Sequence, residues 1–366
     1  MPDRSVQTAI LPATSGVANS RGYLATLDGW RAIAILSVIF YHDRLHSLGS
    51  LSAGWLFIYG HYGVDLFFAI SGVLICWRLL EEEEEFGFIS LRGFYVRRAF
   101  RILPPALAFL AVVGTLGIAG ILSVGFREWL TAVFFCRNYS TLAGTNGYFT
   151  EHFWSLAVEE HFYFLLPSLL LFVPKRWRVP SLSAVCACVI IHRFMVLEHR
   201  RWGHVLFHTD VRLDALLIPA IFAVLVQSPS VRSRFGRWFR LWPAILATVL
   251  WMITTEIGAF WLDTATSLLL PIVVLGTILN AKSRWATWLE WPPLRYVGRI
   301  SYSLYLWQQL FFVGHFYERF PLGILQSTAL RFVALWAIAA GSYHLLERPM
   351  IRLGRRLAPP ATPGRI

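Results

Sequence analysis

The chain has few charged residues for its length. Only 15% of its 366 residues are Asp, Glu, Lys or Arg, whereas a soluble domain has about 25%. Hydrophobic residues make up 56% of the chain and fall into long apolar runs. This composition excludes an ordinary soluble domain and predicts an integral membrane protein.

Acidic residues are scarcer than basic ones. There are 21 Asp and Glu against 33 Lys and Arg, which leaves a formal net charge of +12. Such an excess can indicate a nucleic-acid-binding surface, but here the basic residues lie in short clusters between apolar runs. Clusters of this kind are typical of the cytoplasmic loops of membrane proteins. We therefore expect a membrane-lipid environment and no nucleic-acid partner.

Cysteine is rare and carries no motif. The four cysteines, Cys76, Cys136, Cys186 and Cys188, lie in or beside apolar segments. None has the spacing of a metal site or a redox pair. They are predicted to be small apolar fillers, and no metal site is expected.

The sequence also lacks a secretory signal peptide and an internal repeat. Residues 1–20 contain Asp3 and two prolines, and no sustained apolar run precedes Leu24. We expect residues 1–22 to form a flexible cytoplasmic tail and residues 23–353 to form one transmembrane domain. Residues 354–366 are expected to be a disordered cytoplasmic tail.

Ten segments are apolar and long enough to cross a bilayer, which takes about 20 residues. Spanning helices are expected at roughly 26–44, 62–80, 101–122, 154–173, 181–198, 211–228, 241–257, 263–281, 299–316 and 324–346. With a cytoplasmic N-terminus, every loop on the inner side is the more basic, so both termini are predicted to be cytoplasmic. The predicted fold class is therefore all-α, a polytopic membrane bundle of about ten transmembrane helices.

Shorter features fall between these spans. The apolar segment 128–138 is too short to cross and is expected to lie at the interface or to re-enter the membrane. The run Glu81–Glu85 is expected to be a solvated acidic loop. Pro104 and Pro105 are expected to break the helix just inside the membrane.

The first span carries ionisable groups at both ends. Arg31 and His42 are eleven residues apart, which on a helix places them on one face and about 16 Å apart along its axis. Charge within a span is costly, so such groups either mark its ends or have a function. Helix geometry alone slightly favours end markers.

Polar residues recur in the next two spans. Asp65 is expected to cap its helix or to pair with a basic group such as His42. The small pair Ser71-Gly72 permits the close approach of another helix or, less commonly, of a ligand. The arginines Arg97, Arg98 and Arg101 are either an inner-surface anchor or a clamp for a phosphorylated ligand, because guanidinium groups bind phosphate bidentately.

Later spans hold further polar groups. His152, Ser155 and Glu159 share one helix face and are expected to line a cavity, with Ser155 as a cap or hydrogen-bond donor rather than a nucleophile. Arg212 and Asp214 are two residues apart, so they do not face each other and are expected to pair with other spans. Remaining polar positions are Tyr302, Tyr305, Gln308, Gln309 and Glu347.

Seven stretches together resemble the acyltransferase 3 family, the polytopic membrane enzymes that O-acetylate polysaccharides, lipopolysaccharide and related acceptors. The stretches are LDGWRAIAILSVIFYH, GVDLFFAISG, FYVRRAFRILP, HFWSLAVEEHFYFLLP, RLDALL, GRISYSLYLW and LLERP, between about Leu24 and Leu353. The resemblance implies transfer of an acyl group, usually acetyl, from cytoplasmic acyl-CoA to a hydroxyl of a carbohydrate or glycolipid acceptor on the outer side. It implies a bacterial inner membrane and acyl-CoA as co-substrate, with no bound cofactor.

The resemblance also implies roles for individual residues. His42 is the expected general base, a task that suits an imidazole with an ordinary pKa of about 6.5. Asp65 or Glu159 is expected to orient it. The expected acyl-CoA-binding residues are Arg31, Arg97, Arg98 and Arg101, and the acceptor or oxyanion candidates are Trp154, Ser155, Tyr302, Arg212 and Asp214. Many relatives have histidine where this chain has Gln308, and glycine where it has Pro219-Ala220.

Two other classes fit the same composition. A transporter or flippase for a glycolipid or a small polar solute also needs buried charge and interrupted helices. A receptor or scaffold without catalysis is the third class. Turnover of an acyl-CoA thioester by the purified protein separates the acyltransferase from both.

Overall fold

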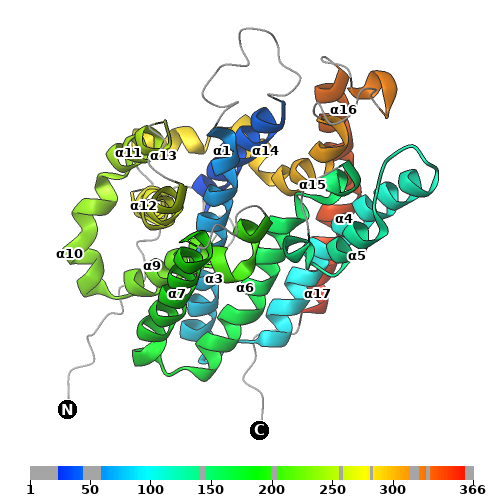
Figure 1. Cartoon of the computed structure of the whole chain (residues 1–366). Coiled ribbons are helices and arrows are strands. Elements are labelled where there is room, and N and C mark those ends of the chain that lie inside the picture. The colour runs from blue at the N-terminus through cyan, green and yellow to red at the C-terminus, as the bar shows by residue number, and fades with distance from the viewer. Residues whose placement is uncertain are drawn as a thin grey trace, which may run out of the picture.

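The chain folds into helices throughout the part that can be described. The computed structural model describes residues 24–43, 59–140, 145–198, 204–254, 259–280, 283–313, 321–326 and 330–358. These residues form α-helices joined by short 3-10 turns and loops, and no strand occurs among them (Figure 1). The predicted all-α class is confirmed, whereas the predicted tail 1–22 lies outside the described residues.

Each expected span contains a helix. In chain order the α-helices are α1 (Ala25–Asp43), α3 (Gly63–Phe86), α4 (Leu91–Ile118), α5 (Phe126–Val133), α6 (Phe153–Phe172), α7 (Lys175–Glu198), α8 (Thr209–Arg212), α9 (Asp214–Gln227), α10 (Pro229–Arg240), α11 (Trp242–Thr254), α12 (Ala259–Leu279), α13 (Arg284–Leu289), α14 (Pro292–Arg299), α15 (Ser301–Phe311), α16 (Leu330–Ser342) and α17 (Arg348–Leu357). However, α4 begins ten residues before the expected 101, and α10, α13, α14 and α17 were not expected. The short apolar segment near residue 130 forms α5, which is too short to cross a bilayer.

Several helices have the length and composition of membrane spans. Five described segments qualify, namely Gly60–Phe86, Leu91–Ile118, Gly147–Phe172, Lys175–Val196 and Leu262–Leu279. The shorter helices Asp214–Gln227 and Trp242–Ile253 are also apolar. A polytopic membrane bundle is therefore supported, while the number of ten spans and the cytoplasmic termini stay predictions.

Helices α1 and α3 lie side by side near the middle of the bundle (Figure 1). Helices α9 and α12 pack against α3, and α14 packs against α1. Helices α10–α13 lie on one side of this centre, and α4, α5, α16 and α17 lie on the other. The centre of the bundle therefore consists of the two helices that carry Arg31, His42, Asp65 and Ser71.

A glycine permits the close contact between α3 and α9. A Cβ added to Gly72 of α3 would lie only 2.4 Å from the carbonyl oxygen of Leu216 in α9. Any larger residue would push α9 away, because the contact is with backbone atoms. The expected close helix approach at Ser71-Gly72 is confirmed for Gly72.

Helix α4 corrects one expectation. It runs unbroken through Pro104 and Pro105, although each proline removes one donor from the helix. The carbonyls that lose a partner are those of Phe100 and Arg101, four residues earlier. In the same turn the Tyr302 hydroxyl donates to the carbonyl oxygen of Ile102 (2.9 Å), so α15 contacts α4 beside the two prolines.

The glutamate run corrects a second expectation, because it is helical rather than a loop. It forms the last turns of α3, and its side chains bind basic groups of neighbouring helices. Glu82 pairs with Arg97 of α4 at 3.0 Å. Glu83 accepts two hydrogen bonds from Arg178 of α7, at 2.6 and 2.8 Å. The glutamate run therefore links α3 to α4 and to α7.

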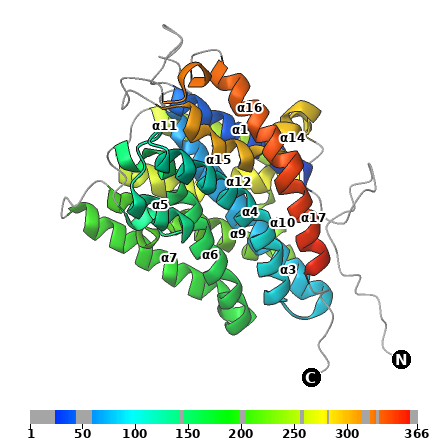
Figure 2. The same ribbon diagram turned by 90° about the vertical axis from the view of Figure 1, so that its right-hand side faces the viewer.

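The last helical segment is longer than the predicted span 324–346. Figure 2 shows α16 and α17 as one continuous rod that passes beside α4. A π-helical turn, Tyr343–Glu347, joins the two helices. It places the buried carboxylate of Glu347 at 2.8 Å from the Ser303 hydroxyl, which donates to it. The LLERP stretch therefore has a local structural role: it forms the end of the π-helical turn and binds Ser303 of α15.

Candidate active site

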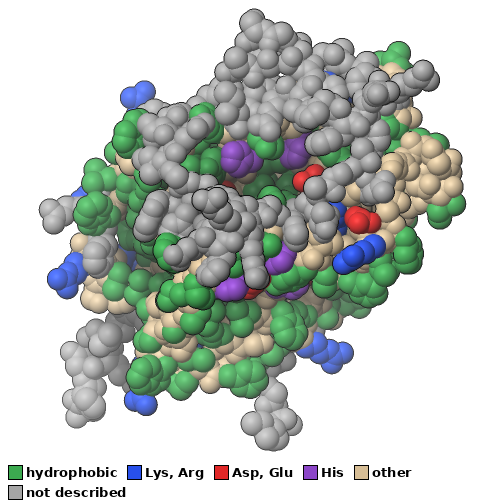
Figure 3. Space-filling view, in the orientation of Figure 1, with side chains coloured by type: hydrophobic (Ala, Val, Ile, Leu, Met, Phe, Trp, Pro, Cys, Tyr) green, Lys and Arg blue, Asp and Glu red, His purple; other side chains and the backbone are tan. Residues whose placement is uncertain are grey.

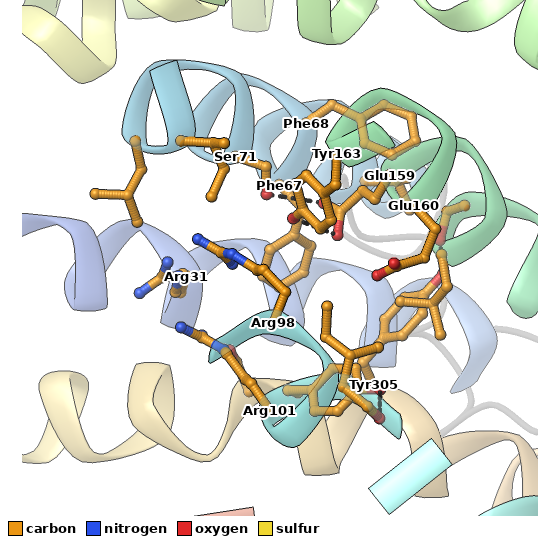
Figure 4. Close-up of a pocket in the computed structure, with 18 residues that line it drawn as sticks. Arg31, Phe67, Phe68, Ser71, Arg98, Arg101, Glu159, Glu160, Tyr163 and Tyr305 are labelled. Carbon is orange, nitrogen blue, oxygen red and sulfur yellow. Dashed lines mark hydrogen bonds between the residues drawn. The ribbon is translucent and has the colours of Figure 1, made fainter. Parts of the chain in front are cut away.

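A polar pocket of about 90 Å³ lies where α1, α3, α4, α6 and α15 meet. Three arginines reach into it, Arg31 from α1 and Arg98 and Arg101 from α4 (Figure 4). Glu159 and Glu160 of α6 lie across from them. The pocket therefore sets a basic wall against an acidic one in the middle of an apolar bundle.

Two hydrogen bonds fix the acidic wall. The Ser71 hydroxyl donates to Glu159 at 2.8 Å, and the Tyr163 hydroxyl donates to the other carboxylate oxygen at 3.2 Å. Glu160 lines the same pocket and makes no hydrogen bond or ion pair within the described part of the chain. Glu159 is thus held in place, whereas the carboxylate of Glu160 is available to a ligand.

The basic wall is only weakly neutralised by the protein. Arg31 lies 3.5 Å from Asp28. The guanidinium of Arg98 lies over the ring of Tyr163, 5.0 Å from its centroid. Neither Arg98 nor Arg101 forms an ion pair with any described residue, although Arg97 next to them pairs with Glu82. The guanidinium groups of Arg98 and Arg101 can therefore bind an anionic group of a ligand that enters the pocket.

A pair of hydroxyls closes another part of the pocket. Ser155 of α6 and Tyr305 of α15 are buried, and their oxygens lie 2.6 Å apart. Both are within hydrogen-bond reach of the carbonyl oxygen of His152, at 3.3 and 3.0 Å. Tyr305 was not among the predicted site residues, although the SYSLYLW stretch that contains it carries the family resemblance.

His42 does not line this pocket. Its Nδ1 lies 2.8 Å from the carbonyl oxygen of Val38, one turn earlier on α1. Val38 packs in the same buried apolar cluster as Val64 and Phe68, which line the pocket. Arg31 and His42 are therefore on one helix as predicted, but only Arg31 lines the pocket.

The contact with Val38 has a chemical consequence for His42. A carbonyl oxygen only accepts hydrogen bonds, so Nδ1 must carry the hydrogen. In the neutral ring the lone pair is then on Nε2.

Asp65 pairs with a basic group, which was one of the two expected arrangements, but the partner is not His42. The Asp65 carboxylate instead accepts from Arg212 at 2.5 Å. Arg212 also pairs with Asp263 of α12, at 2.8 Å. The buried arginine is needed here because an isolated carboxylate at this depth would be very costly.

Arg212 and Asp214 pair with other spans, as their spacing predicts. The carboxylate of Asp214 accepts two hydrogen bonds from Arg193 of α7, at 3.0 and 2.8 Å. Together with the Arg212 contacts, these bonds connect α3, α7, α8, α9 and α12. Neither residue lines the pocket.

The remaining predicted residues divide between the pocket and its surroundings. Tyr302 lines the pocket, with its hydroxyl bound to the Ile102 carbonyl. Trp154 lies outside the pocket, and its ring contacts Phe68 and Phe207. Gln308 is fully buried, and its amide makes no hydrogen bond with the described residues.

A buried ion pair holds the end of α1 next to His42. Asp43 and Arg331 of α16 are both fully buried and in direct contact. The Arg331 guanidinium also lies near the rings of Phe312 and Phe332, 5.5 and 5.6 Å from their centroids. The pair therefore fixes the helix end that carries His42 against the last long helix.

Replacing Arg331 by methionine is expected to destabilise the protein strongly. Removing one partner of a buried pair leaves the other charge uncompensated and costs about 3–5 kcal/mol. Thermal unfolding in detergent should show a clearly lower midpoint for this variant, and a partial return in the double variant with Asp43→Asn. Arg348→Met removes an exposed arginine on the same rod and should change the midpoint little; an equal loss there would contradict the pair's importance.

Histidine side chains gather on one face of the molecule. Figure 3 shows them near acidic and basic groups, with hydrophobic side chains around them. Two histidines bind neighbouring polar groups: His192 Nε2 lies 2.8 Å from the carboxylate of Asp210, and His161 Nδ1 lies 2.6 Å from the hydroxyl of Thr209. Such a face suits the approach of a polar substrate better than contact with lipid.

The fold and the pocket define an all-helical protein of membrane type with an arginine-lined polar site between its central helices. Residues 24–346 match the family model described as "Acyltransferase domain", so the chain belongs to the acyltransferase 3 family. The family resemblance of the seven stretches is thereby confirmed.

Named relatives come from Staphylococcus aureus. A "Putative O-acetyltransferase" of strain COL is 31% identical over 315 residues, which cover 78% of this chain and 50% of the relative. The O-acetyltransferase OatA of strain NCTC 8325 is 28% identical over 367 residues, covering 91% of this chain and 58% of the relative. The chain thus spans about half the length of these relatives. No solved structure matches it significantly.

Proposed function

We propose that the protein is a membrane O-acetyltransferase. It would take an acetyl group from acetyl-CoA on the cytoplasmic side and transfer it to a hydroxyl of a carbohydrate or glycolipid on the outer side of a bacterial cytoplasmic membrane. The family membership and the names of the relatives support the reaction class. The observation that carries the proposal for this chain is the pair Arg98 and Arg101, which lack ion-pair partners among the described residues.

These arginines have the chemistry that coenzyme A requires. Its phosphates are anionic, and guanidinium groups bind phosphate oxygens through two parallel hydrogen bonds. Arg31 lies in the same wall and adds a third positive charge. Arg97 is bound to Glu82 outside the pocket, so the proposal uses Arg31, Arg98 and Arg101 alone.

The rest of the pocket suits the uncharged part of the donor. Phe67, Phe68 and Leu74 form an apolar wall against which the pantetheine arm would pack. The hydroxyls of Ser155 and Tyr305 lie further along. Each has one hydrogen, so a hydroxyl that turns from the carbonyl oxygen of His152 toward the thioester would donate to the oxyanion formed from its carbonyl.

His42 would act as the base. Its Nε2 lone pair takes the proton of the acceptor hydroxyl while the hydroxyl oxygen attacks the thioester carbon. The carbon–sulfur bond then breaks, and the imidazolium returns the proton to the departing thiolate. The Val38 carbonyl, rather than Asp65 or Glu159, orients the ring. Since His42 does not line the pocket, this step requires the acetyl group and the His42 ring to move toward each other.

A second candidate for the base is Glu160. It lies in the pocket itself, and its carboxylate has no partner among the described residues. In that case the acceptor would have to reach deeper, beside Tyr302 and Tyr305. The choice between His42 and Glu160 is made by comparing their variants.

The test of the proposal is acetyl transfer by the purified protein in nanodiscs. Acetyl-CoA labelled in the acetyl group is supplied with a panel of glycans and lipid-linked glycans, and labelled ester and free CoA are measured together. Stoichiometric formation of both is expected with at least one acceptor class. If the protein neither binds CoA nor consumes the thioester with any acceptor, the proposal fails and a transporter becomes the better interpretation.

A further inference from the structure

A second and larger hollow lies on the other side of α1 and α3. It has a volume of about 850 Å³, and its lining is almost entirely apolar. One wall is formed by Trp30, Ile33 and Ser37 of α1, and the facing wall by α11, including Leu246 and Val249. Arg31 on α1 faces the active-site pocket, so the two cavities share this helix.

Such a hollow is not stable when empty. Protein interiors are packed to the density of organic crystals, and apolar side chains that face a void lose their dispersion contacts. Helix α11 packs against α12 and leaves the space toward α1 unfilled. In a membrane the material that fills such a groove is hydrocarbon, because water finds too few polar partners there.

The length of the groove matches one lipid chain. Along α11 it extends from Trp242 to Ile253, eleven residues or about 16 Å at the helical rise. Half of a hydrocarbon core is about 15 Å thick. The groove therefore accommodates an acyl chain of a single leaflet rather than a segment that crosses the bilayer.

The residues at the two ends of the groove indicate from which leaflet the acyl chain enters. Arg284 and Trp288 of α13 line one end and are exposed, whereas Tyr59 and Tyr62 line the other. Exposed tryptophan and arginine side chains are typical of the headgroup region. Arg284 lies on the predicted cytoplasmic side, where anionic lipids are attracted by basic residues.

We propose that this groove binds one acyl chain of an anionic phospholipid from the cytoplasmic leaflet, with the lipid phosphate on Arg284. The bound chain packs on the back of α1, the helix that carries Arg31 and His42. The lipid is thus a structural component that supports α1, and its binding is independent of acetyl transfer.

The first experiment is photocrosslinking in nanodiscs of phosphatidylglycerol and phosphatidylcholine. A phosphatidylglycerol with a diazirine in the middle of its chain is expected to label peptides of α1 and α11 around Ile33, Leu246 and Val249. A tenfold excess of unlabelled phosphatidylglycerol should compete for this labelling. Labelling spread evenly over the lipid-facing helices, without enrichment at the groove, would overturn the proposal.

Substitutions then test the groove itself. Leu246→Trp fills it and should abolish labelling and the lipid adduct seen by native mass spectrometry, whereas Thr248→Trp on the exposed side of α11 should retain both. Arg284→Gln should weaken the preference for phosphatidylglycerol over phosphatidylcholine about fivefold, and Arg240→Gln, which does not line the groove, should not. If Leu246→Trp elutes as folded protein and still shows the labelling and the lipid adduct of wild type, the groove is not the binding site.

Discussion

Replacing His42 by alanine is expected to lower the rate of acetyl transfer by about 10²–10⁴-fold, the usual contribution of a positioned general base. The Michaelis constant for acetyl-CoA should change little, since the pocket arginines are untouched. Initial rates with the acceptor identified in the nanodisc assay measure the effect. His42→Gln should be equally inactive, because an amide has a similar size but cannot take up a proton.

The control and the competing base are tested in the same series. His344→Gln alters an exposed histidine of the π-turn and should keep the wild-type rate. Glu160→Gln distinguishes the two candidates for the base. If Glu160→Gln is inactive while His42→Ala keeps a substantial rate, the base is in the pocket and the assignment to His42 is wrong.

Much of the fold follows from local sequence patterns. Apolar runs of span length predict where most helices lie. The spacing of Arg31 and His42 predicts that both side chains face one side of α1. The shared helix face of His152, Ser155 and Glu159 predicted a cavity lining, and Ser155 and Glu159 line the pocket whereas His152 does not. These features depend on helix periodicity and composition, which are properties of a single segment.

The pairing of distant residues could not be predicted in the same way. Arg212 binds Asp65, 147 positions earlier, and no periodicity links the two. The glutamate run was interpreted as solvated because its partners, including Arg178, come from other helices. The Ser155–Tyr305 contact likewise depends on how α6 and α15 cross. Such contacts are set by packing between helices, and a single sequence does not contain that information.

Replacing Arg98 by alanine is expected to raise the Michaelis constant for acetyl-CoA by about 10- to 150-fold, because a charge-assisted hydrogen bond contributes about 1.5–3 kcal/mol. The turnover number should change much less, since phosphate contacts are equally present before and during the reaction. Arg98→Lys keeps the charge but loses the bidentate geometry, so its effect should be intermediate. Titration calorimetry with CoA provides an independent measure of the same loss.

Arg97→Ala is the matched control, because it removes one positive charge from the neighbouring position of the same helix. Its guanidinium pairs with Glu82 outside the pocket, so the Michaelis constant should stay within about twofold of wild type. A general attraction of CoA to a basic inner surface would instead affect both variants alike, and added salt would remove both effects. A loss that is confined to Arg98 and persists in high salt can come only from direct contact within the pocket, whereas equal losses would make the arginines an anchor at the membrane surface.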